Sequence, residues 1–187
     1  MADVTVNPLL KKIHGKIGGL VFKKYGSGTI IAQMLGLRTT PPTPGQQAQQ
    51  ERFKLAAVYG HTALADPVTG ALYRARAEAK GQPVFSVAVA DFFNEPVVEE
   101  IDLSAYTGKT GEIIRVRASD DFGVVGVGVA IRDTDDKVLE QGAATAASDG
   151  AWTYTTTTNL PAGQQVVIEV SATDRPGHKT TKKQPKA

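Results

Sequence analysis

The chain has 187 residues, of which 41% are hydrophobic and 21% charged, so it is long enough for one large or two small globular domains. The absence of cysteine excludes disulfides, thiolate metal sites and a cysteine nucleophile.

The net charge of +2 divides into +6 for residues 1–93, −9 for residues 94–174 and +5 for residues 175–187. Basic ends and an acidic middle favour head-to-tail contacts between copies, whereas solvated faces and a basic tail explain the same pattern without a partner. No nucleic-acid partner is expected, because the basic residues are scattered and not interleaved with stacking aromatics.

The first twenty residues lack the pattern of a signal peptide. Asp3, Lys11 and Lys16 interrupt any apolar run there, and no stretch of about 18 apolar residues predicts a membrane span. We therefore expect synthesis in the cytoplasm without a signal peptide and, if the protein leaves the cell, a place in a released or extracellular assembly.

The N-terminal segment predicts an extended arm followed by a β-hairpin. Val4 and Val6 belong to the arm and have no partner in the local sequence. In the hairpin, Leu20 and Phe22 lie on one strand and Ile30 on the other, with a Gly/Ser turn between them. Because an isolated two-stranded hairpin is marginal in water, this one needs to pack on the rest of the chain or on another copy.

A proline-rich connector then leads to two predicted helices. Thr43 is a good N-cap for the first, expected over Gln46–Ala65, and Asp66 caps the second, expected over Pro67–Lys80. Residues 83–93 are ambiguous, because alternating apolar residues suggest a strand while a proline at the start suggests a helix. We favour the helix.

Residues from about 96 onward predict a series of strands. Its centre is Ile113–Ala118 and Val125–Arg132, where β-branched residues alternate with Arg, Gly and Ala on either side of an Asp/Gly turn, as in strands with one buried face. The other expected strands are Val97–Leu103, Val138–Gln141, Ala151–Thr157, Val166–Ala172 and His178–Lys182. Short strands with turns at this spacing indicate an immunoglobulin-like sandwich.

The strand-rich half also carries residues that resemble a known family. The segments Ile113–Asp121 and Val166–Gly177, the second ending in Ala-Thr-Asp-Arg-Pro-Gly, resemble bacterial immunoglobulin-like modules, which often close the penultimate strand with an Ala-x-Asp-x-x-Gly-Asn turn. His178 stands where asparagine is usual in that turn. The antibody-type cysteine pair is absent and the single tryptophan, Trp152, lies late in the domain, which argues against the antibody branch.

Over about 40 residues, the N-terminal half is similar to uncharacterised bacterial proteins of phage-like or secreted assemblies. The motifs are Gly15–Phe22 (Gly-Lys-Ile-Gly-Gly-Leu-Val-Phe) and Thr43–Gln46 (Thr-Pro-Gly-Gln). The resemblance implies a structural role and no chemistry.

No catalytic constellation stands out in the sequence. Gly108–Thr110 looks like the end of a phosphate-binding loop, but Leu103 stands where that loop needs a glycine, and a strand is expected where the loop needs a helix. His14, His61 and His178 lie in three different segments without metal-ligand spacing.

Three carboxylates fall in turns at one end of the predicted sandwich: Asp120, Asp121 and Asp174. Clustered carboxylates suit Ca²⁺, but aspartates in turns commonly accept hydrogen bonds from their own turn backbone. We expect the second role and no tight calcium site.

One strand face is unusually bare. Gly126, Gly128 and Ala130 lie opposite the inward valines, and glycine inside a strand often marks the close approach of another backbone. Either the glycines accommodate the domain's own conformation, or the face docks the hairpin, the helices or a neighbouring copy. The polar strand His178–Lys182 is expected either to fray or to be completed by the arm that holds Val4 and Val6.

These patterns predict an α+β fold, with an N-terminal β-hairpin plus short helices in residues 1–94 and an all-β immunoglobulin-like sandwich with a basic tail in residues 95–187. The predicted function is a non-catalytic structural protein that self-assembles into a phage-like particle or an extracellular filament. The alternative is a monomeric immunoglobulin-like module that binds a protein or a carbohydrate. We expect no enzyme activity, cofactor or metal, and as partners we expect copies of the same chain and other assembly proteins. The predicted assembly interface consists of Val4, Val6, Leu20, Phe22, Ile30, Gly126, Gly128 and Ala130.

Overall fold

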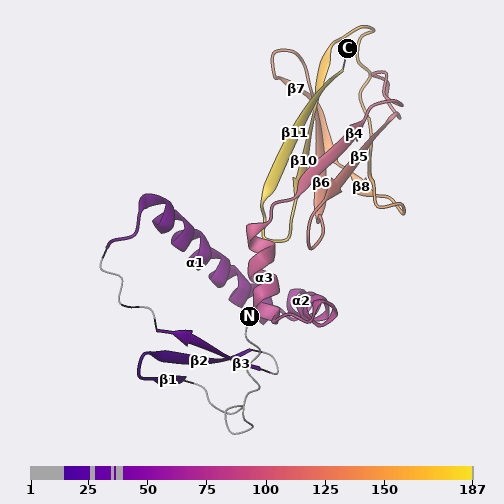
Figure 1. Cartoon of the computed structure of the whole chain (residues 1–187). Coiled ribbons are helices and arrows are strands. Elements are labelled where there is room, and N and C mark those ends of the chain that lie inside the picture. The colour runs from indigo at the N-terminus through magenta and orange to yellow at the C-terminus, as the bar shows by residue number, and fades with distance from the viewer. Residues whose placement is uncertain (1–14, 26–27, 35, 37–39, 187) are drawn as a thin grey trace. The chain divides into compact units, whose positions relative to one another are not determined.

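The computed structural model describes residues 15–25, 28–34, 36 and 40–186 (Figure 1). The chain forms two compact units, residues 1–47 and residues 48–187. Among the described residues, no helix is both long and apolar enough to cross a membrane. The domain boundary predicted after residue 94 stays a prediction.

The first unit contains a three-stranded antiparallel sheet in the order β1-β2-β3. β1 (Gly15–Ile17) pairs with β2 (Leu20–Tyr25) across a turn in which Gly18 has a φ of 59°. A positive φ of this kind suits the tight turn of a hairpin. β2 pairs in turn with β3 (Gly28–Gln33).

The first two helices begin at the predicted caps. α1 (Pro44–Ala65) is preceded by Thr43, which exchanges hydrogen bonds with Gln46: the Thr43 N–H donates to the Gln46 side chain at 3.0 Å and the Gln46 N–H donates to the Thr43 hydroxyl at 3.4 Å. This reciprocal pair is a capping box. α2 (Pro67–Lys80) begins after Asp66, whose carboxylate accepts from a first-turn N–H at 2.7 Å. The sequence interpretation of both helices is confirmed.

The ambiguous segment is helical, as favoured: it forms α3 (Val84–Phe93). Three consecutive residues, Val87 to Val89, are buried, so this helix is enclosed on more than one side. It packs with α2 in a cluster that includes Tyr73 and Ala77. The apolar run that resembled a strand therefore reflects a short buried helix.

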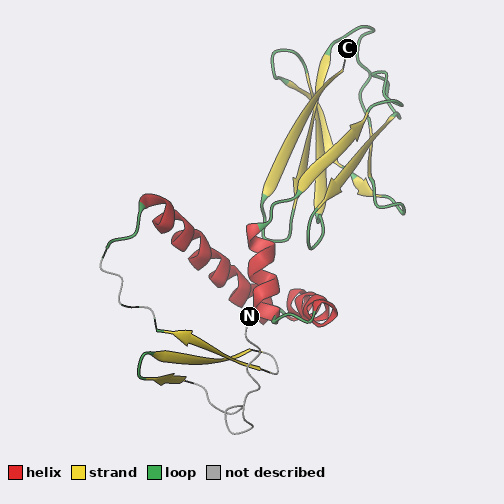
Figure 2. Cartoon of the chain, viewed as in Figure 1, coloured by secondary structure: helices red, strands yellow, loops and turns green. Residues whose placement is uncertain are grey.

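Two four-stranded antiparallel sheets form the β-sandwich of the second unit (Figure 2). One sheet has the order β4-β5-β9-β8, with β4 at Val97–Asp102, β5 at Ile113–Ser119, β8 at Thr145–Ala146 and β9 at Trp152–Thr155. The other has the order β11-β10-β6-β7, with β6 at Gly126–Arg132, β7 at Val138–Ala143, β10 at Val166–Thr173 and β11 at Lys179–Lys186. β5 and β6, which are neighbours in the sequence, therefore belong to different sheets.

The core of the sandwich follows the period-two pattern of the sequence. On β6 every second residue is buried, namely Val127, Val129 and Ile131, and Ile114 and Val116 of β5 enter the same core from the other sheet. Complete burial of a Val or Ile side chain contributes about 1.5–3 kcal/mol. These strands are therefore held mainly by their inward faces.

The polar final strand neither frays nor lacks a partner, contrary to the sequence-based expectation. β11 pairs with β10 over eight residues, from Thr173 opposite Lys179 to Val166 opposite Lys186. Lys182 lies opposite the buried Val170, and its ammonium donates to the backbone carbonyls of the neighbouring strand β4 at 3.3 and 2.5 Å. The aliphatic part of a lysine side chain on an edge strand can thus cover apolar surface while its ammonium group forms hydrogen bonds.

The predicted fold class is wrong. The described part of the chain is mostly β, with eleven strands in three sheets, and in the sequence its three helices come after the N-terminal sheet and before the sandwich. The N-terminal element is a three-stranded sheet and not a hairpin, because the Gly18-Gly19 turn adds β1, and α1 is a helix of 22 residues and not a short one. Only the coarser description, a β-sandwich in the C-terminal part, holds.

Candidate functional site: two interaction surfaces

One face of the N-terminal sheet carries four large apolar side chains, whereas the other combines Val21, Ile30 and Ala32 with Lys16 and Lys23. Cross-strand partners in an antiparallel sheet share a face, and the register pairs Ile17 with Leu20 and Phe22 with Ile31. Because side chains alternate along a strand, Leu20 and Phe22 also lie on the same side. We call these four residues the apolar face.

Within the first unit, the described residues leave the apolar face uncovered. Ile17, Leu20 and Ile31 are 62%, 44% and 54% exposed, and none of the described residues of this unit is buried. The described part of this unit therefore has no buried core, and a cluster of large apolar side chains on a surface is a candidate interaction site.

The predicted interface residues of the N-terminal region are separated by the register. Leu20 and Phe22 lie together on the apolar face. Ile30 pairs with Lys23 and points to the opposite side of the sheet. It is exposed there to a similar degree, 51%. Val4 and Val6 lie outside the described residues. The sequence interpretation missed Ile17 and Ile31, and recognising the Gly18-Gly19 turn would have identified Ile17.

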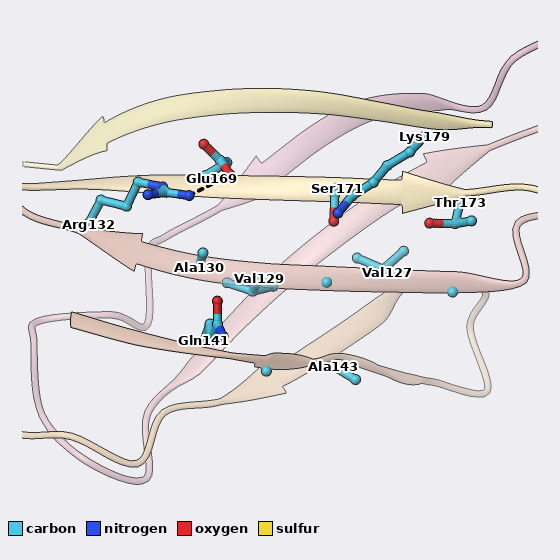
Figure 3. A pocket seen from close by; sticks show the side chains of 13 residues that line it. Val127, Val129, Ala130, Arg132, Gln141, Ala143, Glu169, Ser171, Thr173 and Lys179 are labelled. Atoms are coloured by element: carbon cyan, nitrogen blue, oxygen red, sulfur yellow. Dashed lines mark hydrogen bonds and ion pairs between the residues drawn. The ribbon is translucent and has the colours of Figure 1, made fainter. Parts of the chain in front are cut away.

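The second surface is the outward side of the sheet β11-β10-β6-β7. Gly126, Gly128 and Ala130 line it, as the alternation predicted, and the neighbouring strands add small residues such as Ser171 and Ala143. They form a shallow trough with a volume of about 590 Å³. Figure 3 shows Arg132 beside Glu169 and, farther along the sheet, Lys179 with its side chain directed toward Ser171. We call it the small-residue trough.

The domain's own packing gives a reason for only one of the two glycines. Neither Gly126 nor Gly128 has a positive φ. A Cβ at position 128 would come within 2.9 Å of the Ser171 hydroxyl, whereas a Cβ at position 126 would meet no atom within 4 Å. Glycine in a strand costs about 0.5–1 kcal/mol relative to alanine, so Gly126 is the residue that the described part of the domain does not explain.

The outer face of the other sheet provides a contrast within the same domain. There, Arg117 lies 3.6 Å from Glu100, with both side chains more than 60% exposed, and Arg115 forms an ion pair with Asp149. Long charged side chains of this kind keep a sheet face in water. Charged side chains also lie on the outer face that holds the small-residue trough: Glu169 of the central strand β10 pairs with Arg132 and with Lys183, each at 3.2 Å. The two outer faces therefore differ in the small residues of β6 and not in a lack of ion pairs.

The three turn aspartates do gather at one end of the sandwich, but they bond mainly with backbone. Asp120 accepts hydrogen bonds of 2.9 and 2.8 Å from N–H groups of its own turn, and Asp174 accepts two of 2.7 and 2.6 Å from its turn. Asp121 accepts from the Asn94 side chain at 2.5 Å. Among the described residues, no group of three or more His, Cys, Asp and Glu side chains is arranged to hold a metal ion. The absence of a tight calcium site stays a prediction.

The other residues considered for chemistry have structural contacts. Gly108, with a φ of 99°, lies in the turn between β4 and β5, and the Lys109 N–H beside it donates to Glu112 at 2.9 Å. His61 stacks on Phe85 with ring centroids 4.8 Å apart. His14 lies outside the described residues.

Comparison with known proteins leaves the chain without a family. No known protein family and no curated protein matches the sequence. One solved structure that resembles the chain is "The crystal structure of CopC from Methylosinus trichosporium OB3b", with 19% sequence identity, a TM-score of 0.36, and coverage of 48% of this chain and 89% of that one. At that TM-score the likeness supports no conclusion about this protein.

Proposed function

We propose that this protein is a non-catalytic structural protein whose copies associate through the apolar face of the N-terminal sheet, as building blocks of a phage-like particle or an extracellular filament. The supporting observation is the exposure of Ile17, Leu20 and Ile31 on one side of a sheet that has no described buried residue. A second copy is the occupant we favour, because the basic and acidic segments of the chain are complementary between copies. The small-residue trough would be a second contact surface.

Replacing Ile31 by serine is expected to weaken association at least tenfold. The side chain would be buried against another copy, and burial of an isoleucine contributes about 1.5–3 kcal/mol. Sedimentation velocity over a concentration series measures the effect, with the 19.8 kDa monomer as the lower limit.

Ile30 provides a matched control for that experiment. It is the adjacent residue, has the same side chain and is 51% exposed against 54% for Ile31, but it lies on the opposite side of the sheet. Ile30→Ser should leave association unchanged. Equal loss in both variants would reject the apolar face as the interface, and a wild-type monomer at high concentration would reject self-association altogether.

Replacing Gly128 by lysine is expected to abolish contacts made through the small-residue trough while the protein stays folded. The new side chain points outward, and the one atom that its Cβ would approach within 3.0 Å is the Ser171 hydroxyl, which can rotate. Negative-stain microscopy of wild type and variant would record ordered particles or filaments against dispersed molecules. Unchanged particles in a folded variant would exclude the trough as a contact.

The second candidate, a monomeric module that binds a protein or a carbohydrate through loops at the end of the sandwich, has less support. Phe122 is the aromatic residue that those turns offer for stacking on a sugar. Its ring packs against Tyr73 with centroids 4.4 Å apart, and the Arg175 guanidinium lies 5.5 Å from it. The ring is thus engaged within the protein.

A further inference from the structure

The helices are attached to one end of the sandwich by side-chain contacts, which we call the joint. α2 and α3 supply the residues on one side, and the turns before β6 and before β11 supply those on the other. The contacts include Tyr73 on Phe122, Phe92 against the His178 ring at 5.0 Å, and a 3.0 Å hydrogen bond from Arg76 to the Asp121 carbonyl.

A buried carboxyl group lies within the joint. Asp91 of α3 is 2% exposed. Its Oδ2 accepts a short hydrogen bond from the Tyr73 hydroxyl, which in turn lies 2.7 Å from the Tyr59 hydroxyl. Its Oδ1 has no hydrogen-bond partner among the described residues. A carboxylate usually needs several donors when it is buried, so this one is poorly prepared to carry a charge.

The charges around Asp91 come from every element of the joint. Asp120 and Asp174 act on it from the two turns of the sandwich and disfavour its ionisation, whereas Arg175 favours it. Lys80 and Asp121 line the same small cavity as Asp91, and Asp174 itself pairs with His178 at 2.7 Å. Burial, and then the two neighbouring carboxylates, outweigh the Tyr73 hydrogen bond and raise the pKa of Asp91 to about 6.

The three oxygens can serve both protonation states. With Asp91 ionised, Tyr59 donates to Tyr73 and Tyr73 donates to the carboxylate. With Asp91 protonated on Oδ2, the chain reverses: the carboxyl group donates to Tyr73, and Tyr73 donates to Tyr59, which is only half-buried. A phenol can donate and accept a hydrogen bond, so the hydrogen bonds among Tyr59, Tyr73 and Asp91 can form in both protonation states. Only the state with Asp91 protonated avoids a buried charge.

We propose that Asp91 is a proton-operated latch, which holds the helices on the end of the sandwich more tightly when its carboxyl group is protonated than when it is ionised. The direction of the pH dependence follows from linkage. The pKa of such a group is higher in the folded than in the unfolded protein, so its contribution to stability is complete below the unfolded pKa. That contribution is lost as the pH rises through the folded pKa. For Asp91 this window runs from its ordinary value of 3.8 to about 6.

Hydrogen exchange of the full chain between pH 5 and pH 8, at a concentration where it is monomeric and with intrinsic rates corrected, tests the latch. The amides of α2 and α3 should lose about tenfold in protection from pH 5 to pH 8 in the wild type. In Asp91→Asn the loss should be less than twofold, because the amide keeps the Tyr73 hydrogen bond and cannot ionise. The amides of β6 should show no such change in either protein.

Tyr73→Phe supplies the second variant. It keeps the ring on Phe122 but removes the hydrogen bond that favours the ionised carboxylate, so the midpoint of the protection change should move to higher pH. Protection of α2 and α3 that does not vary with pH in the wild type would overturn the proposal. So would an Asp91→Asn variant with the same pH dependence as the wild type, or a Tyr73→Phe midpoint that stays in place.

Discussion

Replacing Glu140 by alanine is expected to lower the free energy of unfolding by about 2 to 4 kcal/mol. Glu140 is 7% exposed and lies on β7. Its Oε1 accepts from the Tyr154 hydroxyl at 2.8 Å, from the Thr157 N–H at 2.5 Å and from the Thr157 hydroxyl at 3.0 Å, and its Oε2 accepts from the Thr158 N–H at 3.0 Å. Truncation leaves these donors without their acceptor, and the Tyr154 hydroxyl is itself in the core. Urea unfolding at pH 7 measures the loss.

The same carboxylate makes the sandwich sensitive to acid. Burial by itself raises the pKa of Glu140, but the hydrogen bonds from Thr157, Tyr154 and Thr158 together outweigh it, so the pKa lies below its ordinary value of 4.5. The stability that it contributes is therefore complete above pH 4.5 and is lost as the pH falls through the lower, folded value.

Glu140→Gln separates the charge from the hydrogen bonds. It keeps an acceptor for Tyr154 and Thr157 but turns an NH₂ group toward the Thr158 N–H, so at pH 7 it should cost less than the alanine variant. Its unfolding free energy should also fall less steeply than that of the wild type between pH 4.5 and pH 3. Parallel acid profiles of the two proteins would show that the pKa of Glu140 is the same in the folded and the unfolded protein, so that its charge makes no net contribution to stability.

Replacing Gly142 by alanine is expected to destabilise the sandwich by about 1–3 kcal/mol. An added Cβ would lie 2.7 Å from a ring carbon of Tyr154 and 3.2 Å from its hydroxyl. That ring is 6% exposed and is held by the hydrogen bond to Glu140, so it cannot move aside without breaking a buried contact. Thermal unfolding of the variant should show a clearly lower Tm.

Gly126 is the matched control for Gly142. It lies in the same sheet, but a Cβ there meets nothing within 4 Å and the residue has no positive φ. Gly126→Ala should therefore raise the stability of the monomer by roughly 0.5–1 kcal/mol. If the small-residue trough is a contact between copies, the same variant should weaken association. A destabilised Gly126→Ala monomer would show that the glycine is needed within the domain after all.

Local patterns in the sequence predicted most of the individual elements. The caps at Thr43 and Asp66 place the first two helices, because side-chain capping is a local interaction. The alternation in Gly126–Arg132 correctly divides inward from outward residues, because a strand has a period of two whatever sheet it enters. Val125, which belongs to the same predicted run, precedes the strand and is 49% exposed. The outward position of Gly126, Gly128 and Ala130 could therefore be predicted without a structure.

Contacts distant in sequence escaped the same reasoning. Ile30 and Ile31 are adjacent and therefore lie on opposite faces of their strand, but only the pairing of β2 with β3 shows that Ile31, and not Ile30, shares a face with Phe22. The buried acid Asp91 looks like any polar residue of a short helix until α2 brings Tyr73 to it. Glu140 likewise can be buried only because Tyr154 of β9 and the two residues Thr157 and Thr158 after that strand donate four hydrogen bonds to its carboxylate.

The amino-acid sequence thus determined where most strands and helices form, β1 and β8 excepted, and which side of the core strands is apolar, because capping, turn conformation and alternation depend on residues a few positions apart. The tertiary structure decided which strands share a sheet, which apolar side chains gather on the exposed N-terminal face and which carboxyl groups are buried. These properties depend on which distant segments come together to exclude water, and that choice is made by the packing of the whole chain.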